Sequence, residues 1–307
     1  MHNDSVRTGH LIVSDSDKKY RVIQRLGSGG NCDVFLVVSL SAEYRGALFA
    51  LKLFMKTDNP ERWRQFLAEV ELLKNIEHPS VLHVYDSGET ALPTRAGKST
   101  HPYVVADYYP ETLDRAMSRG MRIPAKVLCM VQLLAALHHL ASMRPPVVHR
   151  DIKPRNIFLR GHTCALGDFG LMRQVDDTME DAAVILEKLS GGPGMPRGYR
   201  TPDLVRYAKG EAPLTVSSDL FQLGLVAAEL FAGHNPMKPA KNTLAPIEIS
   251  PIRNISGRHG ATFLNLIERM LVQDPERRES VEELLDSWEG ILNAVSHDYQ
   301  HLEGRAF

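Results

Sequence analysis

The sequence predicts an α+β fold, in which a small strand-rich part with one main helix precedes a larger, mostly helical part. Strand-like apolar runs separated by turn residues occupy much of the stretch from residue 20 to 106. After residue 107, apolar residues recur at the 3.6-residue spacing of helices. Hydrophobic residues make up 43% of the 307 residues, enough for the core of two modest domains or one two-lobed domain.

Composition argues against several classes of protein. The formal net charge is -1 and no basic stripe is visible, so we expect no nucleic-acid partner. Cys32, Cys129 and Cys164 lie far apart and form no CxxC pair, which argues against a disulfide framework or a zinc site and fits a reducing cytosol. The N-terminus lacks the apolar core of a signal peptide, and no uninterrupted apolar run is long enough to span a membrane. We therefore expect a soluble, cytoplasmic protein.

The first part of the chain reads as an arm followed by a hairpin. Residues 1–17 are polar and predict a flexible or loosely docked arm. Residues 20–26 and 32–38 are strand-like, and the glycine cluster 27–30 lies between them. The tip of such a hairpin can approach phosphate groups through its backbone N–H groups.

One helix and two more strands complete this part. The spacing of Trp63, Phe66 and Val70 predicts a helix over 61–76, with a proline at its start. Residues 81–86 and 103–106 predict strands, separated by a polar loop over 90–100. In the second part, we expect helices over 112–119, 125–143, 263–271 and 281–292, and short strands over 157–159 and 163–166.

The stretch from Val147 to Gly170 carries the strongest chemical signal. It contains H-R-D-I-K-P-R-N and then, after a short hairpin, D-F-G. This pattern resembles the catalytic centre of protein kinases. The resemblance implies that Asp151 accepts or orients the hydroxyl proton, that Asn156 and Asp168 hold Mg²⁺, and that Lys153 steadies the charge of the moving phosphate. The alternative is an ordinary charged surface loop. The presence of both motifs at this separation argues against that alternative.

The resemblance also implies a site for ATP. Glu69 is expected to pair with Lys52, because its rival Glu71 lies about 200° further round the helix. Cys32 stands where the family has its third glycine; we favour a small residue filling a strand end over a reactive thiol near the nucleotide. Ala106 takes the gatekeeper position, and its small side chain leaves space behind the adenine. The residues expected to contact the nucleotide are Gly27, Gly29, Gly30, Val34, Ala50, Lys52, Asp107, Tyr108, Tyr109 and Phe158.

Residues 168–201 correspond to the kinase activation segment. Arg150, beside Asp151, resembles the arginine that clasps a loop phosphate, and Thr178 and Ser190 are the candidate acceptors. The acidic run 176–181 offers an alternative, in which built-in negative charge mimics the phosphate. We favour regulation by phosphorylation slightly.

Two further aspartates match structural positions of the family. Asp203 stands for the glutamate of the closing A-P-E motif, and its expected partner is Arg278, with Arg277 as the competitor. Asp219 resembles the aspartate that braces the catalytic loop, and it also reads as a helix N-cap. The threonine usually found shortly before the position of Tyr199 is not evident, which puts the substrate-docking geometry in question.

The resemblance covers about 270 residues in the family's order, which is broader evidence than any single motif. It implies a bilobal protein kinase-like fold with an arm (1–17), an N-lobe (18–106), a hinge and C-lobe (107–296) and a tail (297–307). Lys153 points to serine/threonine rather than tyrosine phosphorylation. The implied function is that of a protein kinase that uses ATP and Mg²⁺ to phosphorylate protein hydroxyl groups. The kinase is also expected to phosphorylate itself, and two copies would associate so that one phosphorylates the other. The alternatives are a pseudokinase scaffold and a small-molecule phosphotransferase.

Overall fold

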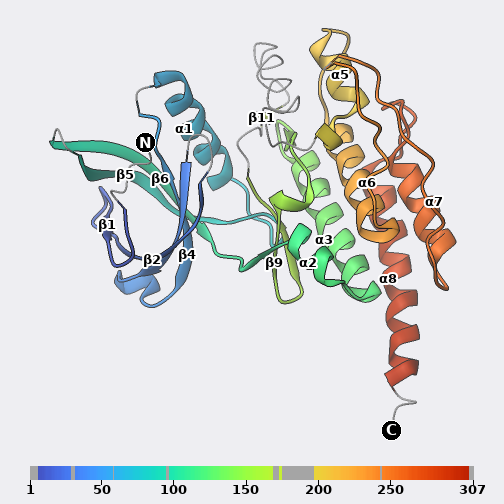
Figure 1. Ribbon diagram of the computed structural model, residues 1–307, viewed down its shortest axis with the longest axis horizontal. Coiled ribbons are helices and arrows are strands. Elements are labelled where there is room, and N and C mark those ends of the chain that lie inside the picture. The colour runs from blue at the N-terminus through green and yellow to red at the C-terminus, as the bar shows by residue number, and fades with distance from the viewer. Residues whose placement is uncertain are drawn as a thin grey trace. The chain divides into compact units, whose positions relative to one another are not determined.

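The computed structural model divides the chain into two compact units, Met1–Pro110 (unit 1) and Glu111–Phe307 (unit 2). It describes residues 6–28, 32–57, 59–94, 97–168, 173–174, 197–242 and 244–303. Unit 1 is mainly sheet and unit 2 mainly helix, as the sequence predicts (Figure 1). The division falls at Pro110, whereas the sequence analysis placed the boundary after residue 106.

Unit 1 is built on one antiparallel sheet of six strands in the order β1-β2-β3-β4-β6-β5. The strands are β1 (Leu11–Val13), β2 (Lys19–Ser28), β3 (Cys32–Ser39), β4 (Leu48–Phe54), β5 (Val84–Thr94) and β6 (Gly97–Asp107), and the 3-10 helix η1 (Ala42–Tyr44) joins β3 to β4. Successive side chains of a strand point to opposite faces, so one face gathers the apolar residues. The core includes Val37, Leu51, Leu53, Tyr103 and Val105.

The first residues of the chain differ from the predicted arm. β1 pairs with β2, with Ile12 opposite Tyr20, and the Ile12 side chain is fully buried. The Thr90 hydroxyl of β5 donates to the carbonyl oxygen of Val13 at 3.0 Å. The apolar run Leu11–Val13 is only three residues long within an otherwise polar segment, too short a signal to predict a strand, which is why the sequence predicted an arm.

The polar stretch 90–100 also differs from its prediction, because it continues two strands instead of forming a loop. β5 and β6 pair as far as Thr94 opposite Gly97. Leu92 and His101 within this hairpin are buried, whereas Ala91 and Pro93, on either side of Leu92 in the chain, are exposed. Polar side chains on the solvent face of a hairpin look like a loop in sequence, so the prediction was wrong here.

The helix of unit 1, α1 (Pro60–Lys74), begins as its sequence indicates. The Asn59 side chain caps the helix by accepting a backbone N–H of the first turn at 3.0 Å. Pro60 is the first helical residue, where a backbone N–H would have no partner within the helix, so its absence loses no hydrogen bond. Phe66 and Val70, one turn apart, are buried. The predicted span of 61–76 is therefore confirmed to within two residues.

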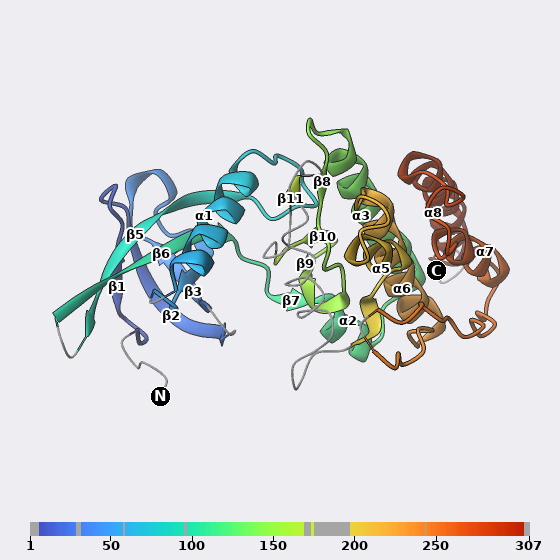
Figure 2. The same cartoon turned by 90° about the horizontal axis from the view of Figure 1, so that it is seen from above.

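Unit 2 is a set of helices with two small sheets, which lie to one side of the helices (Figure 2). Its strands form a three-stranded sheet, β10-β9-β7, and a two-stranded one, β11-β8. The helices are α2 (Leu113–Arg119), α3 (Ile123–Ser142), α5 (Pro202–Ala208), α6 (Val216–Ala232), α7 (Gly260–Met270) and α8 (Val281–Glu303). The short elements are β7 (Glu111–Thr112), β8 (Val147–Val148), η2 (Pro154–Asn156), β9 (Ile157–Arg160), β10 (Thr163–Leu166), β11 (Arg173–Gln174) and η4 (Arg197–Tyr199).

The helix α6 runs through the interior of unit 2. It begins after Thr215, and almost all of its residues are buried. At its far end, the Phe231 ring lies 4.6 Å from Phe263 and 5.5 Å from Trp288, measured between ring centroids. Since α6 is surrounded by protein, its few polar side chains must find partners inside the unit.

The helix α3 is long and apolar enough to cross a membrane, judged by length and composition alone. In unit 2 it packs against α6, α8 and β10, and Met130, Leu133 and Leu137 have no exposed surface. The core helix of a soluble domain passes the same test. The packing favours the expectation that the chain has no membrane span, which stays a prediction.

The last helix, α8, extends further than predicted. Ser280 and Glu283 form a reciprocal capping box at its start: the Glu283 N–H donates to Ser280 Oγ at 3.2 Å, and the Ser280 N–H donates to Glu283 Oε2 at 2.9 Å. The helix continues to Glu303, with Val295 buried and Asp298 2.8 Å from His259 Nε2. The predicted tail over 297–307 is therefore wrong for residues 297–303, which are helical.

Candidate functional site

The loop between β8 and β9 in unit 2 brings together three of the predicted catalytic residues. Lys153 Nζ lies 2.9 and 2.8 Å from the two carboxylate oxygens of Asp151. The side-chain amide of Asn156 donates to Asp151 Oδ2 at 2.9 Å and to the Asp151 carbonyl oxygen at 2.8 Å. All three residues are at most 9% exposed. The Asp151 carboxylate is thus oriented from two sides.

Burial raises the pKa of Asp151 above its usual range, since the charged form loses its hydration. The neighbouring Lys153 ammonium acts in the opposite direction and favours the carboxylate. A nearby carboxylate, that of Asp168, adds to the upward shift. Asp151 is therefore a carboxylate whose proton affinity is set by its position in the loop, as a general base requires.

The backbone of this loop is held from α6. Arg150 has a φ of 70°, in the left-handed region that residues other than glycine rarely adopt. The Asp219 carboxylate accepts the N–H groups of His149 and Arg150, both at 2.7 Å. Burial raises the pKa of Asp219 to about 7, although these two N–H groups act to lower it. Thr215 holds the N-cap position of α6, and Asp219 lies in the first turn after it, so Asp219 braces the loop and is not an N-cap.

Gln222, one turn further along α6, completes this support and was missed in the sequence. Its Oε1 accepts the Ile152 N–H at 2.8 Å, and its Nε2 donates to the carbonyl oxygens of Arg150 at 3.1 Å and Tyr199 at 2.9 Å. It is 1% exposed. The available signal was a glutamine three residues after Asp219 in a mostly apolar helix, a polar group that needs internal partners.

His149 is a second supporting residue that was given no role from sequence. It is fully buried; Nε2 lies 3.2 Å from the Gly167 carbonyl oxygen, and Nδ1 accepts the Asp151 N–H at 3.3 Å. This pattern assigns the neutral ring with its proton on Nε2. Burial lowers the pKa of His149 to about 4, so the ring stays neutral at neutral pH.

Asp168 follows β10 and is the last described residue of its segment. It is exposed and has a φ of 57°. Its charge acts on both Asp151 and His149, which places it close to the catalytic loop. The remaining residues of the D-F-G motif, Phe169 and Gly170, lie outside the described residues.

The oxygen atoms in this region suit Mg²⁺. Among the described residues, no group of three or more His, Cys, Asp or Glu could hold a metal ion. Mg²⁺ usually takes only one or two protein carboxylates and completes its shell with phosphates and water. Asp168 supplies a carboxylate, and Asn156 presents its amide oxygen because both hydrogen bonds given above use its nitrogen. A cation would also relieve the repulsion between Asp151 and Asp168.

Unit 1 contains the predicted lysine–glutamate pair. Lys52 Nζ of β4 lies 2.9 Å from Glu69 Oε1 of α1, and the Glu69 side chain is largely buried. The rival Glu71 instead pairs with Lys74 at 2.8 Å on the exposed side of the helix. The assignment of Glu69 to Lys52 is therefore confirmed as a contact.

Other described residues that are predicted to contact the nucleotide lie on strands of both units. Val34 of β3 lies opposite both Gly27 and Lys52, and Ala50 lies opposite Ala106. In unit 2, Phe158 lies opposite Thr112 and Ala165. Gly29 and Gly30 lie outside the described residues.

The predicted hinge begins at the end of β6. The Asp107 carboxylate accepts the His83 N–H at 3.2 Å and the Tyr85 hydroxyl at 3.3 Å, so its side chain fixes the end of the strand. Tyr109 is buried, whereas Tyr108 is half-buried. Contact of these residues with adenine stays a prediction.

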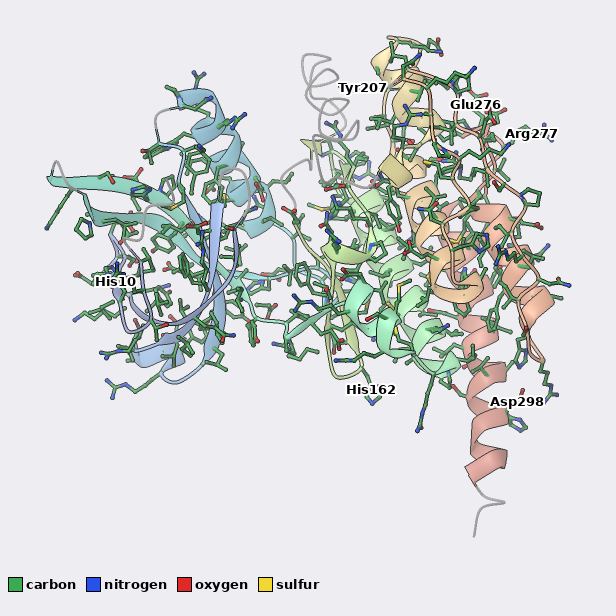
Figure 3. All side chains as sticks on the ribbon, viewed as in Figure 1. His10, His162, Tyr207, Glu276, Arg277 and Asp298 are labelled. Atoms are coloured by element: carbon green, nitrogen blue, oxygen red, sulfur yellow. The ribbon has the colours of Figure 1, made fainter. Side chains whose placement is uncertain are left out.

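The predicted ion pair between Asp203 and Arg278 is present. Of the predicted regulatory residues, the structure describes only Arg150. Arg278 donates to both oxygens of Asp203, at 3.1 and 3.0 Å. The buried Arg150 guanidinium lies 5.8 Å from the ring centroid of Tyr207 in α5 (Figure 3). Thr178 and Ser190 lie outside the described residues, so the phosphate clasp stays a prediction.

A buried aspartate oriented by a lysine and an asparagine, on an α+β chain with a separate lysine–glutamate pair, defines a phosphotransferase of the kinase type. Residues 20–288 match the model of the protein kinase domain family. The chain belongs to this family, and the predicted kinase-like fold is confirmed.

Similar proteins carry names of serine/threonine kinases. Serine/threonine-protein kinase 36 of Pongo abelii is 29% identical over 274 residues, which are 87% of this chain and 19% of that protein. Serine/threonine-protein kinase pkn2 of Myxococcus xanthus is 29% identical over 306 residues, 93% of this chain and 34% of that protein. Probable serine/threonine-protein kinase SCO3848 of Streptomyces coelicolor is 28% identical over 294 residues, 90% of this chain and 40% of that protein. The chain thus spans less than half the length of each of these relatives.

Proposed function

We propose that this chain transfers the γ-phosphoryl group of Mg-ATP to serine and threonine hydroxyls of proteins. The observation that carries the proposal is the Asp151 carboxylate, held by Lys153 and Asn156 within hydrogen-bonding distance. Membership of the protein kinase domain family and the names of the relatives support it.

Each residue has a defined task in this reaction. Asp151 orients the acceptor hydroxyl and takes its proton, and the raised pKa of the carboxyl brings its basicity closer to that of a useful base at neutral pH. The Lys153 ammonium is placed to neutralise charge on the transferred group. In unit 1, Glu69 orients Lys52 toward phosphate binding.

Asn156 and Asp168 would hold Mg²⁺ through oxygen atoms. The ion supplies charge neutralisation for the phosphate oxygens when it is bound. Before it binds, the Asn156 amide is already fixed by its two hydrogen bonds to Asp151, so the same side chain serves both the base and the metal site.

The two alternatives have less support. A pseudokinase scaffold usually lacks the strand lysine, the catalytic aspartate or the metal aspartate, and Lys52, Asp151 and Asp168 are all present. A small-molecule phosphotransferase is not favoured by the names of the relatives. A cytoplasmic location, and self-association for autophosphorylation in trans, remain parts of the proposal.

The test is incubation of the purified chain with Mg-ATP and a generic basic protein, followed by mass spectrometry of phosphorylated sites. We expect phosphoserine or phosphothreonine with the wild type and none with Asp151→Asn, which should still bind ATP. Phosphate on Thr178 or Ser190 would support a phosphorylated activation segment, and phosphate on substrate alone would favour the acidic run 176–181 as a built-in mimic. Equal activity in the wild type and Asp168→Asn would overturn the mechanism.

A further inference from the structure

Two cysteines that are far apart in the sequence meet in the interior of unit 2. Cys129 lies on α3 and Cys164 on β10, 35 positions later, and their sulfur atoms are 2.6 Å apart. They are 3% and 1% exposed, and both are free thiols. The absence of a CxxC motif argued against a disulfide framework, but the fold supplies a pair that spacing cannot reveal.

The backbone around this pair is already tied together. Gln132, three residues after Cys129 on α3, accepts the Cys164 N–H at 2.7 Å through Oε1. Its Nε2 donates to the carbonyl oxygen of His162, in the turn between β9 and β10, at 3.0 Å (Figure 3). Because helix and hairpin are fixed on both sides of Cys164, the sulfur atoms are held together rather than meeting by chance.

We propose that Cys129 and Cys164 are an oxidative modification site, at which a hydroperoxide forms a disulfide that fastens α3 to β10. One thiol, as its thiolate, attacks the O–O bond and becomes a sulfenic acid while the leaving oxygen takes a proton. The other thiol then attacks that sulfur and displaces the second oxygen as water. With hydrogen peroxide, the two thiols lose two electrons and two protons, and the peroxide becomes two molecules of water.

Burial sets the rate of this modification. It raises the pKa of the Cys164 thiol well above its usual range, which lowers the thiolate fraction available for attack. Access also requires a small oxidant and local opening of the unit. The disulfide therefore forms more slowly than oxidation of the partly exposed Cys32.

The expected effect is on stability more than on catalysis. A disulfide bond of about 2.05 Å needs only a small further approach of the two sulfur atoms. The strand that leads to Asp168 should therefore stay in place, with kcat within about twofold of the reduced value. The bond closes a loop in the unfolded chain and so raises the thermal midpoint.

The test uses the full chain with Cys32→Ala, so that Cys129 and Cys164 are its remaining thiols. The folded protein is treated with hydrogen peroxide, and its peptides are mapped without reduction. We expect one cross-linked peptide pair, an intact mass lower by two hydrogen atoms and a higher thermal midpoint, all reversed by a phosphine reductant. The same protein before and after oxidation is compared, so the result does not depend on the folding of a core variant.

Cys129→Ala and Cys164→Ala in the same background are the matched controls, and neither should give the cross-link or the reversible rise. The proposal fails if no cross-linked pair forms even at peroxide concentrations and incubation times well beyond those that fully oxidise Cys32 in the wild type. It also fails if the pair forms and the thermal midpoint does not rise. Both results are read from mass and melting, so they are independent of kinase activity.

Discussion

The Asp219 carboxylate accepts the backbone N–H of Arg150 at 2.7 Å, and Arg150 is the residue directly before the catalytic Asp151. Its φ of 70° is a conformation that needs support from its surroundings. The second oxygen of Asp219 accepts the His149 N–H at the same distance. An aspartate in the first turn of α6 therefore holds the backbone from which the Asp151 side chain projects.

We predict that Asp219→Ala is both unstable and nearly inactive. Two buried N–H groups would lose their acceptor, at a cost of about 1–3 kcal/mol each. Urea denaturation should show an unfolding free energy lower by about 2–6 kcal/mol, and kcat should fall at least about tenfold because Asp151 is misplaced. Asp286→Ala removes an exposed carboxylate of α8 and should change neither value. Wild-type kcat in Asp219→Ala would rule out the bracing role.

His149 should make stability depend on pH. Its pKa is lowered from 6.5 to about 4 in the folded chain, so the folded state favours the neutral ring. The stabilisation is complete above the unfolded pKa and is lost as the pH falls from about 6.5 toward about 4. Between pH 7.5 and pH 5, this one group should lower the unfolding free energy by about 2 kcal/mol.

The matched test is His149→Gln, whose amide cannot be protonated in this range. Urea denaturation at several pH values should give a loss on acidification that is smaller than in the wild type by about the same 2 kcal/mol. His162→Gln, which removes an exposed imidazole, serves as the control (Figure 3). Equal pH dependence in His149→Gln and the wild type would show that His149 is not held neutral by the fold.

Lys153 should control the acidic side of the pH–rate profile. Its ammonium, in contact with both Asp151 oxygens, lowers the pKa of that carboxyl against the raising effect of burial. In Lys153→Met the Asp151 pKa rises, so the acidic limb of kcat/KM moves to higher pH, and kcat falls by about 100-fold or more. Lys153→Arg keeps the charge and should keep the limb near its original position. If the acidic limb of kcat/KM stays at the same pH in Lys153→Met, Lys153 does not influence the pKa of Asp151.

The sequence identified those site residues whose role is carried by local motifs. Asp151, Lys153 and Asn156 lie within six positions of one another, so a short loop suffices to bring them together. Lys52 and Glu69 come from different elements but keep recognisable neighbours, and their contact follows from the family pattern.

The residues that were missed depend on packing between distant segments. Gln222 acts on a loop 70 positions earlier, and Cys129 meets Cys164 only when α3 lies against β10. The strand β1 and the long β5–β6 hairpin were missed for a related reason. The strand β1 is only three residues long, and the hairpin exposes polar residues to solvent. Only pairing with neighbouring strands shows that these segments are strands.

The ion pair between Asp203 and Arg278 gives the last prediction. It joins α5 to the segment before α8, and the two side chains are 3% and 0% exposed. Arg278 also donates to the Val272 carbonyl oxygen at 2.9 Å. Removing one partner of a buried pair leaves an uncompensated charge, so Asp203→Ala should lower the unfolding free energy by about 3–5 kcal/mol. Chemical denaturation measures this loss.

The neighbouring Arg277 supplies the control, because it is exposed at the margin of unit 2 (Figure 3). Arg277→Ala should stay within about 0.5 kcal/mol of the wild type, as surface substitutions usually do. The double variant Asp203→Ala/Arg278→Met should be more stable than Asp203→Ala alone, because it removes the buried charge that the single substitution leaves unpaired. If the double variant is no more stable than Asp203→Ala, the loss comes from packing and not from the unpaired guanidinium.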